Sequence, residues 1–190
     1  MLAGATVNGM ADIAEQDIPG VLLITPTAHG DERGRFVETY RREWFAEAPE
    51  MIQGNRSEKQ AGALVGLHFH RFQADYWYVL RGIARVGLAD LRAGSPTEGT
   101  AMTIDLDGNR DQGLYIPRGV AHGFAALTDL LLTYLVDGYY NPDDELGVAF
   151  DDPAFGIDWG ISDPITSERD KRNPRFADLD DAIRPQWPAS

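Results

Sequence analysis

Several things are scarce or absent in this sequence. It contains no cysteine, which excludes disulfides and thiolate chemistry. No apolar run approaches the roughly 20 residues of a membrane-spanning helix, and residues 1–17 have neither the basic start nor the apolar stretch of a signal peptide. Basic residues are few, with 17 Lys and Arg against 30 Asp and Glu, for a net charge of −13. We therefore expect a cytoplasmic protein with no nucleic acid and no membrane as partner.

Short β-prone runs separated by turn residues are abundant. They cover 21–25, 35–40, 63–69, 76–80, 84–89, 103–105, 114–116, 122–125, 131–136 and 148–150. Many short strands at close spacing are typical of an all-β sandwich or barrel, and one short helix is expected over 41–48. A chain of 190 residues suits one domain. We expect a flexible lead-in over 1–17, a single domain over 18–174 and a C-terminal tail over 175–190 that wraps the surface as coil or short helix.

Three of the four histidines lie in patterned positions. His68 and His70 are two residues apart, so on a strand they point to the same face. Residues 62–82 read Gly, five residues, His-x-His, four residues, Asp75, six residues, Gly, and residues 117–122 read Pro-x-Gly-x-x-His122. These stretches resemble the two cupin motifs, with Asp in place of the usual Glu. The resemblance implies a jelly-roll β-barrel with short flanking helices.

The residue types in these motifs allow two interpretations. Two imidazoles on one strand face, a carboxylate on the next strand and a third imidazole across the barrel can enclose a divalent metal. The same residues can equally line a polar pocket that holds no metal.

A second, longer pattern runs from about residue 20 to residue 174. In chain order it comprises DERGRFVE at 31–38, QGNRS at 53–57, GALVGLH at 62–68, DLR at 90–92, IPRGVAHGF at 116–124, Tyr134, YYNPDDE at 139–145, IDW at 157–159 and SERD at 167–170. This series resembles the dTDP-4-dehydrorhamnose 3,5-epimerase (RmlC) family. The resemblance implies a cupin homodimer without a metal. It also implies an isomerase that abstracts a proton next to the C4 ketone of a dTDP-4-keto-6-deoxy sugar, at C3 or at both C3 and C5.

The resemblance also implies roles for single residues. His68 matches the catalytic base, Asp170 the carboxylate that orients it and favours its protonated form, and Tyr134 the group that returns a proton from the opposite face. From the residues alone, Tyr134 sits in an apolar run typical of core and Asp170 in a charged tail. The implied substrate-binding residues are Arg33, Phe36 and Glu38, which reach over from the partner subunit, together with Gln53, Asn55, His122 and Tyr140.

The match breaks at the expected site. The Arg of the family pattern that contacts phosphate is Val65 here, its Gln is His70, and the Lys that stabilises the enolate is Asp75. An anion beside a developing oxyanion raises the barrier, and losing one stabilising contact costs about 3 kcal/mol. Either the enzyme is slow, or another cation fills the gap. Lys59, which stands where the family has Ser, and Arg71 are the candidates, and we include Lys59 among the substrate-binding residues.

The same substitutions support an alternative hypothesis. In the leading interpretation the enzyme needs no cofactor and no metal. In the alternative, one divalent metal ion is bound by His68, His70, Asp75 and His122, in a metal-dependent cupin enzyme acting on a small carbonyl or sugar substrate. The metal would occupy His68, so the two interpretations compete for that residue. A third possibility is a non-catalytic sugar-nucleotide-binding protein.

Overall fold

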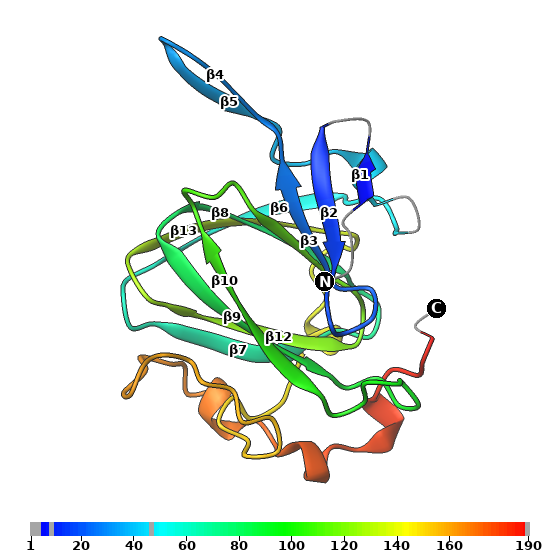
Figure 1. Ribbon diagram of the computed structural model, residues 1–190. Helices are drawn as coiled ribbons and strands as arrows, with labels where there is room; N and C mark the ends of the chain where they lie inside the picture. Colours follow the sequence, from blue (N-terminus) through cyan, green and yellow to red (C-terminus); the bar gives the residue numbers. More distant parts are fainter. Residues whose placement is uncertain (1–4, 8–9, 46–47, 189–190) are drawn as a thin grey trace.

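The computed structural model describes residues 5–7, 10–45 and 48–188, and these form two facing β-sheets (Figure 1). One sheet has the order β1-β2-β3-β11-β8-β13-β6, and the other has the order β10-β9-β12-β7-β14. The first comprises β1 (Ala5–Val7), β2 (Ala11–Glu15), β3 (Leu22–Pro26), β6 (Gln53–Lys59), β8 (Asp75–Arg81), β11 (Gly113–Ile116) and β13 (Leu130–Val136). The second comprises β7 (Leu64–Phe69), β9 (Ile83–Asp90), β10 (Ala101–Asp107), β12 (Val120–Ala126) and β14 (Leu146–Gly147). This arrangement confirms the expected all-β cupin jelly roll.

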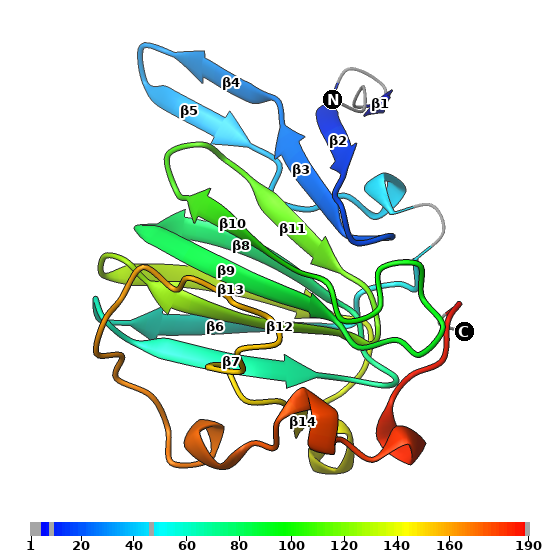
Figure 2. The same cartoon turned by 60° about the horizontal axis from the view of Figure 1, so that its bottom comes forward.

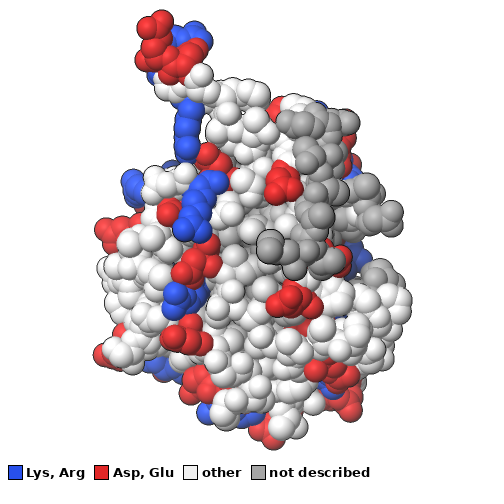
Figure 3. Space-filling view, in the orientation of Figure 1, with Lys and Arg blue, Asp and Glu red and all other residues white. Residues whose placement is uncertain are grey.

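A two-stranded hairpin projects from this body. It consists of β4 (Ala28–Asp31) and β5 (Gly34–Val37), which pair with each other in a sheet of their own. Both ribbon views show it standing clear of the barrel (Figures 1 and 2). Acidic and basic side chains gather at its tip, which carries Asp31, Glu32 and Arg33 (Figure 3).

Alternating side chains of the two sheets meet in an apolar core. Val79, Leu114 and Leu132 from one sheet face Leu88 and Phe124 from the other, and all five are at most 4% exposed. Two further clusters cover the outer faces. Trp44 and Phe45, in and after the short 3₁₀ helix η1 (Arg42–Trp44), pack on the larger sheet. The C-terminal segment packs on the smaller one (Figure 2).

Trp159 fixes the C-terminal segment against the smaller sheet. Its ring lies over Gly87 and Gly123, and a Cβ at Gly87 would come within 2.5 Å of it. The indole Nε1–H donates to the carbonyl of Phe150 at 2.9 Å. The segment continues through the 3₁₀ helices η3 (Asp170–Arg172), η4 (Phe176–Asp178) and η5 (Asp181–Ile183). Its docking therefore brings Asp170 to the barrel.

The structure corrects three local expectations. Within the predicted flexible lead-in 1–17, Ala11–Glu15 form β2, because Ala11 and Ile13 pack into the cluster around Trp44. The helix expected over 41–48 is only the turn η1, and residues 46–47 lie outside the described part. The strand expected over 148–150 is displaced to β14, although Val148 is fully buried. No helix in the described part of the chain is long and apolar enough to cross a membrane.

Candidate active site

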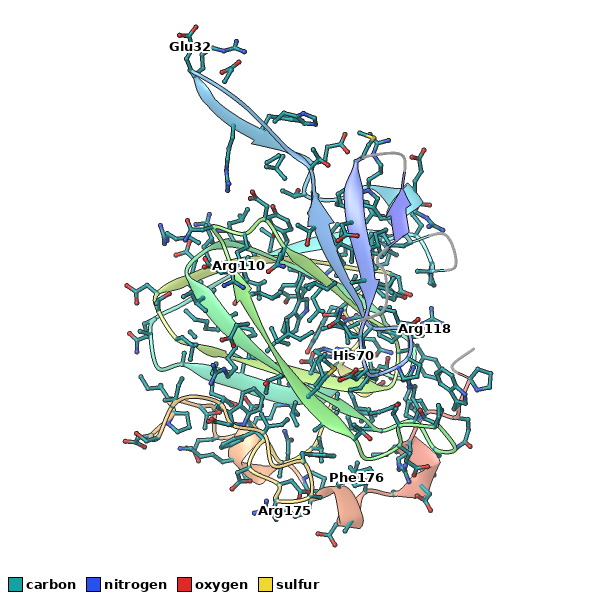
Figure 4. All side chains as sticks on the ribbon, viewed as in Figure 1. Glu32, His70, Arg110, Arg118, Arg175 and Phe176 are labelled. Carbon is teal, nitrogen blue, oxygen red and sulfur yellow. The ribbon has the colours of Figure 1, made fainter. Side chains whose placement is uncertain are left out.

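A cavity of about 460 Å³ lies between the two sheets. Its walls come from β6, β8 and β13 on one side and from β7 and β12 on the other, with the segment after β13 contributing at the rim. Figure 4 shows His70, one of the lining residues, in the interior of the barrel. Of the residues singled out in the sequence, those that line the cavity are Gln53, Asn55, Lys59, Val65, His68, His70, Asp75, His122, Tyr134 and Tyr140.

His68 and Asp170 form a tight pair at this cavity. The Nε2–H of His68, on β7, donates to Asp170 Oδ1 at 2.7 Å. The Asp170 side chain is 4% exposed. Burial alone would raise the pKa of Asp170, but the hydrogen bond and charge of His68 hold it below its usual value. Since Nε2 is engaged, the free ring nitrogen is Nδ1, which lies 3.9 Å from Glu145 Oε1.

A close crossing of β7 and β12 positions His68. Gly66 has φ +110°, in the left-handed region, and a Cβ there would lie 2.6 Å from Gly123 Cα. Only glycine fits both constraints. The Gly66 N–H also points to Asp170 Oδ2 at 3.5 Å. The glycine therefore brings the backbone of β7 to the same carboxylate that binds the imidazole.

Tyr134 lies on the opposite wall. It sits on β13 in the larger sheet, in register with Asn55 and Trp77, while His68 belongs to the smaller sheet. Burial raises the pKa of Tyr134, and the nearby charges of Asp75 and Glu145 raise it further. The phenol is therefore kept protonated and is able to donate a proton into the cavity.

The predicted four-residue metal set is not assembled. His70, Asp75 and His122 each offer a ligand atom within 4.8 Å of the other two. His68 is bound to Asp170 instead, and His70 lies just beyond the end of β7 at Phe69. Burial lowers the pKa of His122 to about 4, although Asp75 raises it, so this imidazole is neutral.

Three predicted substrate-binding residues lie away from this cavity. Arg33 forms an ion pair with Asp31 at the hairpin tip, and Phe36 is 66% exposed on the same hairpin. Glu38 pairs with Arg41 at 2.8 Å. None of the three lines the cavity of its own chain. Their contact with the substrate of a partner subunit stays a prediction.

The structure also brings forward residues to which the sequence gave no role. Glu145 faces His68 Nδ1, and Trp77 lines the cavity from β8. Asp144, 4% exposed, accepts the backbone N–H groups of Arg71 and Phe72 at 2.9 Å each. It thereby holds the loop after His70. Their only sequence signal was membership of the strand expected over 76–80 and of the run 139–145.

Comparisons with known proteins agree with this architecture. The family model described as dTDP-4-dehydrorhamnose 3,5-epimerase matches residues 15–178. The dTDP-4-dehydrorhamnose 3,5-epimerase of Shigella flexneri is 32% identical over 179 residues, covering 89% of this chain and 98% of the relative. That of Mycobacterium tuberculosis is 36% identical over 185 residues, covering 91% and 92%.

Solved structures are similar over almost the whole chain. One is the 3,5-epimerase RmlC from Legionella pneumophila in complex with dTDP-4-keto-L-rhamnose, with a TM-score of 0.88, 30% identity and coverage of 93% of this chain and 98% of that one. Another is ChmJ, a 3′-monoepimerase from Streptomyces bikiniensis in complex with dTDP-quinovose. Its TM-score is 0.84 at 33% identity, with 92% and 93% covered.

Proposed function

Because the chain belongs to the dTDP-4-dehydrorhamnose 3,5-epimerase family, we propose that His68, Asp170 and Tyr134 carry out its reaction. The protein is an isomerase that acts on a dTDP-4-keto-6-deoxy sugar. The protons at C3 and C5 of such a sugar flank the ketone, so removing either one leaves an enolate. Inversion then requires a base on one face, an acid on the other and stabilisation of the oxyanion.

His68 is the base in this proposal. Its Nδ1 lone pair takes the proton from carbon, while Nε2–H keeps its 2.7 Å bond to Asp170. The carboxylate then faces the imidazolium that forms and stabilises its charge. This buried pair at the cavity is the observation that carries the proposal.

Tyr134 is the acid on the other face. It comes from the sheet opposite His68, and its raised pKa keeps the proton that it must give. The enolate carbon receives that proton from the face opposite the one that lost it, which inverts the centre. The phenolate then recovers a proton from solvent and His68 releases its own.

The remaining cavity residues bind substrate in this proposal. Gln53 donates to Asn55 at 3.0 Å and accepts the Tyr140 N–H at 3.3 Å, so the three form a connected polar wall. Among the described residues that line the cavity, Lys59 is the only Lys or Arg, and in this proposal its ammonium group binds the negative charge of the substrate. His122 faces this wall from β12, on the opposite side of the cavity.

In this proposal the protein is a homodimer, and Arg33, Phe36 and Glu38 reach the cavity of the second subunit. Arg33 and Phe36 lie in the projecting hairpin and Glu38 directly follows it (Figure 1). Sedimentation of the protein tests the dimer. Arg33→Ala is expected to raise KM for the nucleotide sugar and leave the fold unchanged. A monomer with full activity would contradict this assignment.

The test of the activity is proton exchange. The protein is incubated with dTDP-4-keto-6-deoxyglucose in heavy water, and deuterium at C3 and C5 is followed by NMR. Label at both carbons indicates a 3,5-epimerase, and label at C3 alone indicates a 3-epimerase. If neither carbon exchanges, the protein does not act on this substrate.

A further inference from the structure

We propose that His70, Asp75 and His122 bind one divalent transition-metal ion at a site separate from the His68–Asp170 pair. The three ligand atoms lie within 4.8 Å of one another, and the residues are 9%, 3% and 6% exposed. The base therefore stays free when the metal is bound. Only the part that the metal plays in catalysis rests on the function proposed above.

The two imidazoles are held in the orientation that metal ligands need. The Nδ1 atom of His70 lies 2.9 Å from the carbonyl oxygen of Asp144, and that of His122 lies 2.9 Å from the carbonyl oxygen of Val120. A carbonyl only accepts, so each Nδ1 carries the hydrogen and each Nε2 carries a lone pair. In the described part of the chain no hydrogen bond reaches either Nε2. A backbone carbonyl that fixes the far nitrogen is the usual outer support of a ligating histidine.

Asp75 is oriented by neutral donors. Gln73 donates to its Oδ1 at 2.9 Å, and the Trp77 indole donates to its Oδ2 at 3.0 Å. These bonds fix the carboxylate without offsetting its charge, and each oxygen keeps a second lone pair. His122 Nε2 lies 3.9 Å from Asp75 Oδ2. A cation between these two atoms would satisfy both.

The spacing and the donor types suit a transition metal. Ligand atoms around a four-coordinate Zn²⁺, each about 2.1 Å from the metal, lie about 3.4 Å apart. The separations here, from 3.9 Å between His122 and Asp75 to at most 4.8 Å, require only a small approach of the side chains. Two imidazoles and one carboxylate favour Zn²⁺, Fe²⁺ or Co²⁺ over Mg²⁺ and Ca²⁺, which prefer oxygen ligands. With three protein ligands, a further coordination position is left open.

The charge of the cavity supports a cation here. Its lining carboxylates are Asp75, Asp144 and Glu145, against the single ammonium group of Lys59 among the described lining residues. An enolate oxygen next to these carboxylates would be repelled. A metal ion bound by Asp75 would supply the positive charge that stabilises this oxygen, which the carboxylate alone cannot do.

Metal binding is tested on untagged protein that has been stripped with a chelator. Co²⁺ is titrated into the full chain, followed by visible absorption and calorimetry, and Zn²⁺ is then added as a competitor. We expect one Co²⁺ per chain, displaced by one Zn²⁺. Losing an outer-shell partner of a metal ligand typically weakens binding by 10–100-fold, so losing a ligand in His70→Gln, Asp75→Asn or His122→Gln is expected to weaken it by about 100-fold or more.

Two matched controls retain the three ligands. His68→Asn is expected to bind Co²⁺ as the wild type does while losing proton exchange, and replacement of the exposed hairpin residue in His29→Gln is expected to leave Co²⁺ binding unchanged. Thermal unfolding of each variant shows that the fold is kept. If the buried His122 variant does not fold, His70→Gln decides the question.

Absence of Co²⁺ and Zn²⁺ binding by the wild type would overturn the site. So would a loss of binding in His68→Asn as large as that in His70→Gln. Either result leaves the epimerase proposal standing if deuterium still enters the sugar. Conversely, the protein could bind the metal through these residues and yet catalyse no deuterium exchange into the sugar. That result would uphold the metal site and refute the proposed function.

Discussion

Replacing Asp170 with Asn separates the two contributions that the carboxylate makes to His68. The amide oxygen of Asn can still accept the Nε2–H, so the geometry of the pair is kept. The negative charge is lost, and with it the stabilisation of the imidazolium formed when Nδ1 takes the proton. We expect slower exchange without loss of substrate binding, and therefore a lower kcat at similar KM.

The size of the effect follows from the geometry. The pair is 2.7 Å apart, and the carboxylate side chain is 4% exposed, so solvent screens it little. A hydrogen bond to a charged group contributes about 1.5–3 kcal/mol and a neutral one about 1 kcal/mol. The difference of about 0.5–2 kcal/mol corresponds to a rate loss of about 2–30-fold. His68→Asn removes the base itself, at a cost of about 10²–10⁴-fold.

The assay is deuterium incorporation into dTDP-4-keto-6-deoxyglucose, measured at saturating substrate for both variants. Asp152→Asn is the matched control, because Asp152 is a buried carboxylate in the same C-terminal region that binds backbone N–H groups outside the cavity. Wild-type rates in Asp170→Asn would refute the role of the charge. Undiminished exchange in His68→Asn would refute the assignment of the base.

Three other predictions concern Tyr134, Trp159 and the ion pair between Asp90 and Arg92. Tyr134→Phe is expected to lower product formation by about 10²–10⁴-fold, while His68 still exchanges the proton on its own face; full epimerisation would rule Tyr134 out as the acid. Trp159→Ala removes the ring that lies on the smaller sheet and is expected to lower the free energy of unfolding by about 3–5 kcal/mol in urea titrations. Asp90→Asn removes the negative charge that pairs with the buried guanidinium of Arg92, at a cost of about 3–5 kcal/mol at neutral pH. Burial raises the pKa of Asp90, but Arg92 and two hydroxyl groups hold it below its usual value. The stability it contributes is therefore present above about pH 3.9 and lost as the pH falls through the lower folded pKa, so the deficit of the variant should shrink in acid.

Most strands of the barrel could be predicted because one of their faces is apolar. β8, β9, β12 and β13 carry continuous or alternating apolar side chains that fill the space between the sheets. β6 was missed for the opposite reason. Its sequence, QGNRSEK, alternates between half-buried and exposed residues, but the half-buried ones are polar because they line the cavity. A strand whose inner face binds a polar ligand gives no hydrophobic period.

The candidate site shows the same limit at the level of single side chains. The spacing of His68 and His70 predicts that both point to one face, which holds only while both residues lie on a strand. β7 ends at Phe69, and β12 shifts register against β7 between His122 and Phe124. The two resemblances implied both neighbours, Asp170 for His68 and Asp75 for His70, but they did not imply that His68 stands apart from the other three residues. In the two proposals made above, base and metal therefore do not compete, because each proposal relies on a different histidine.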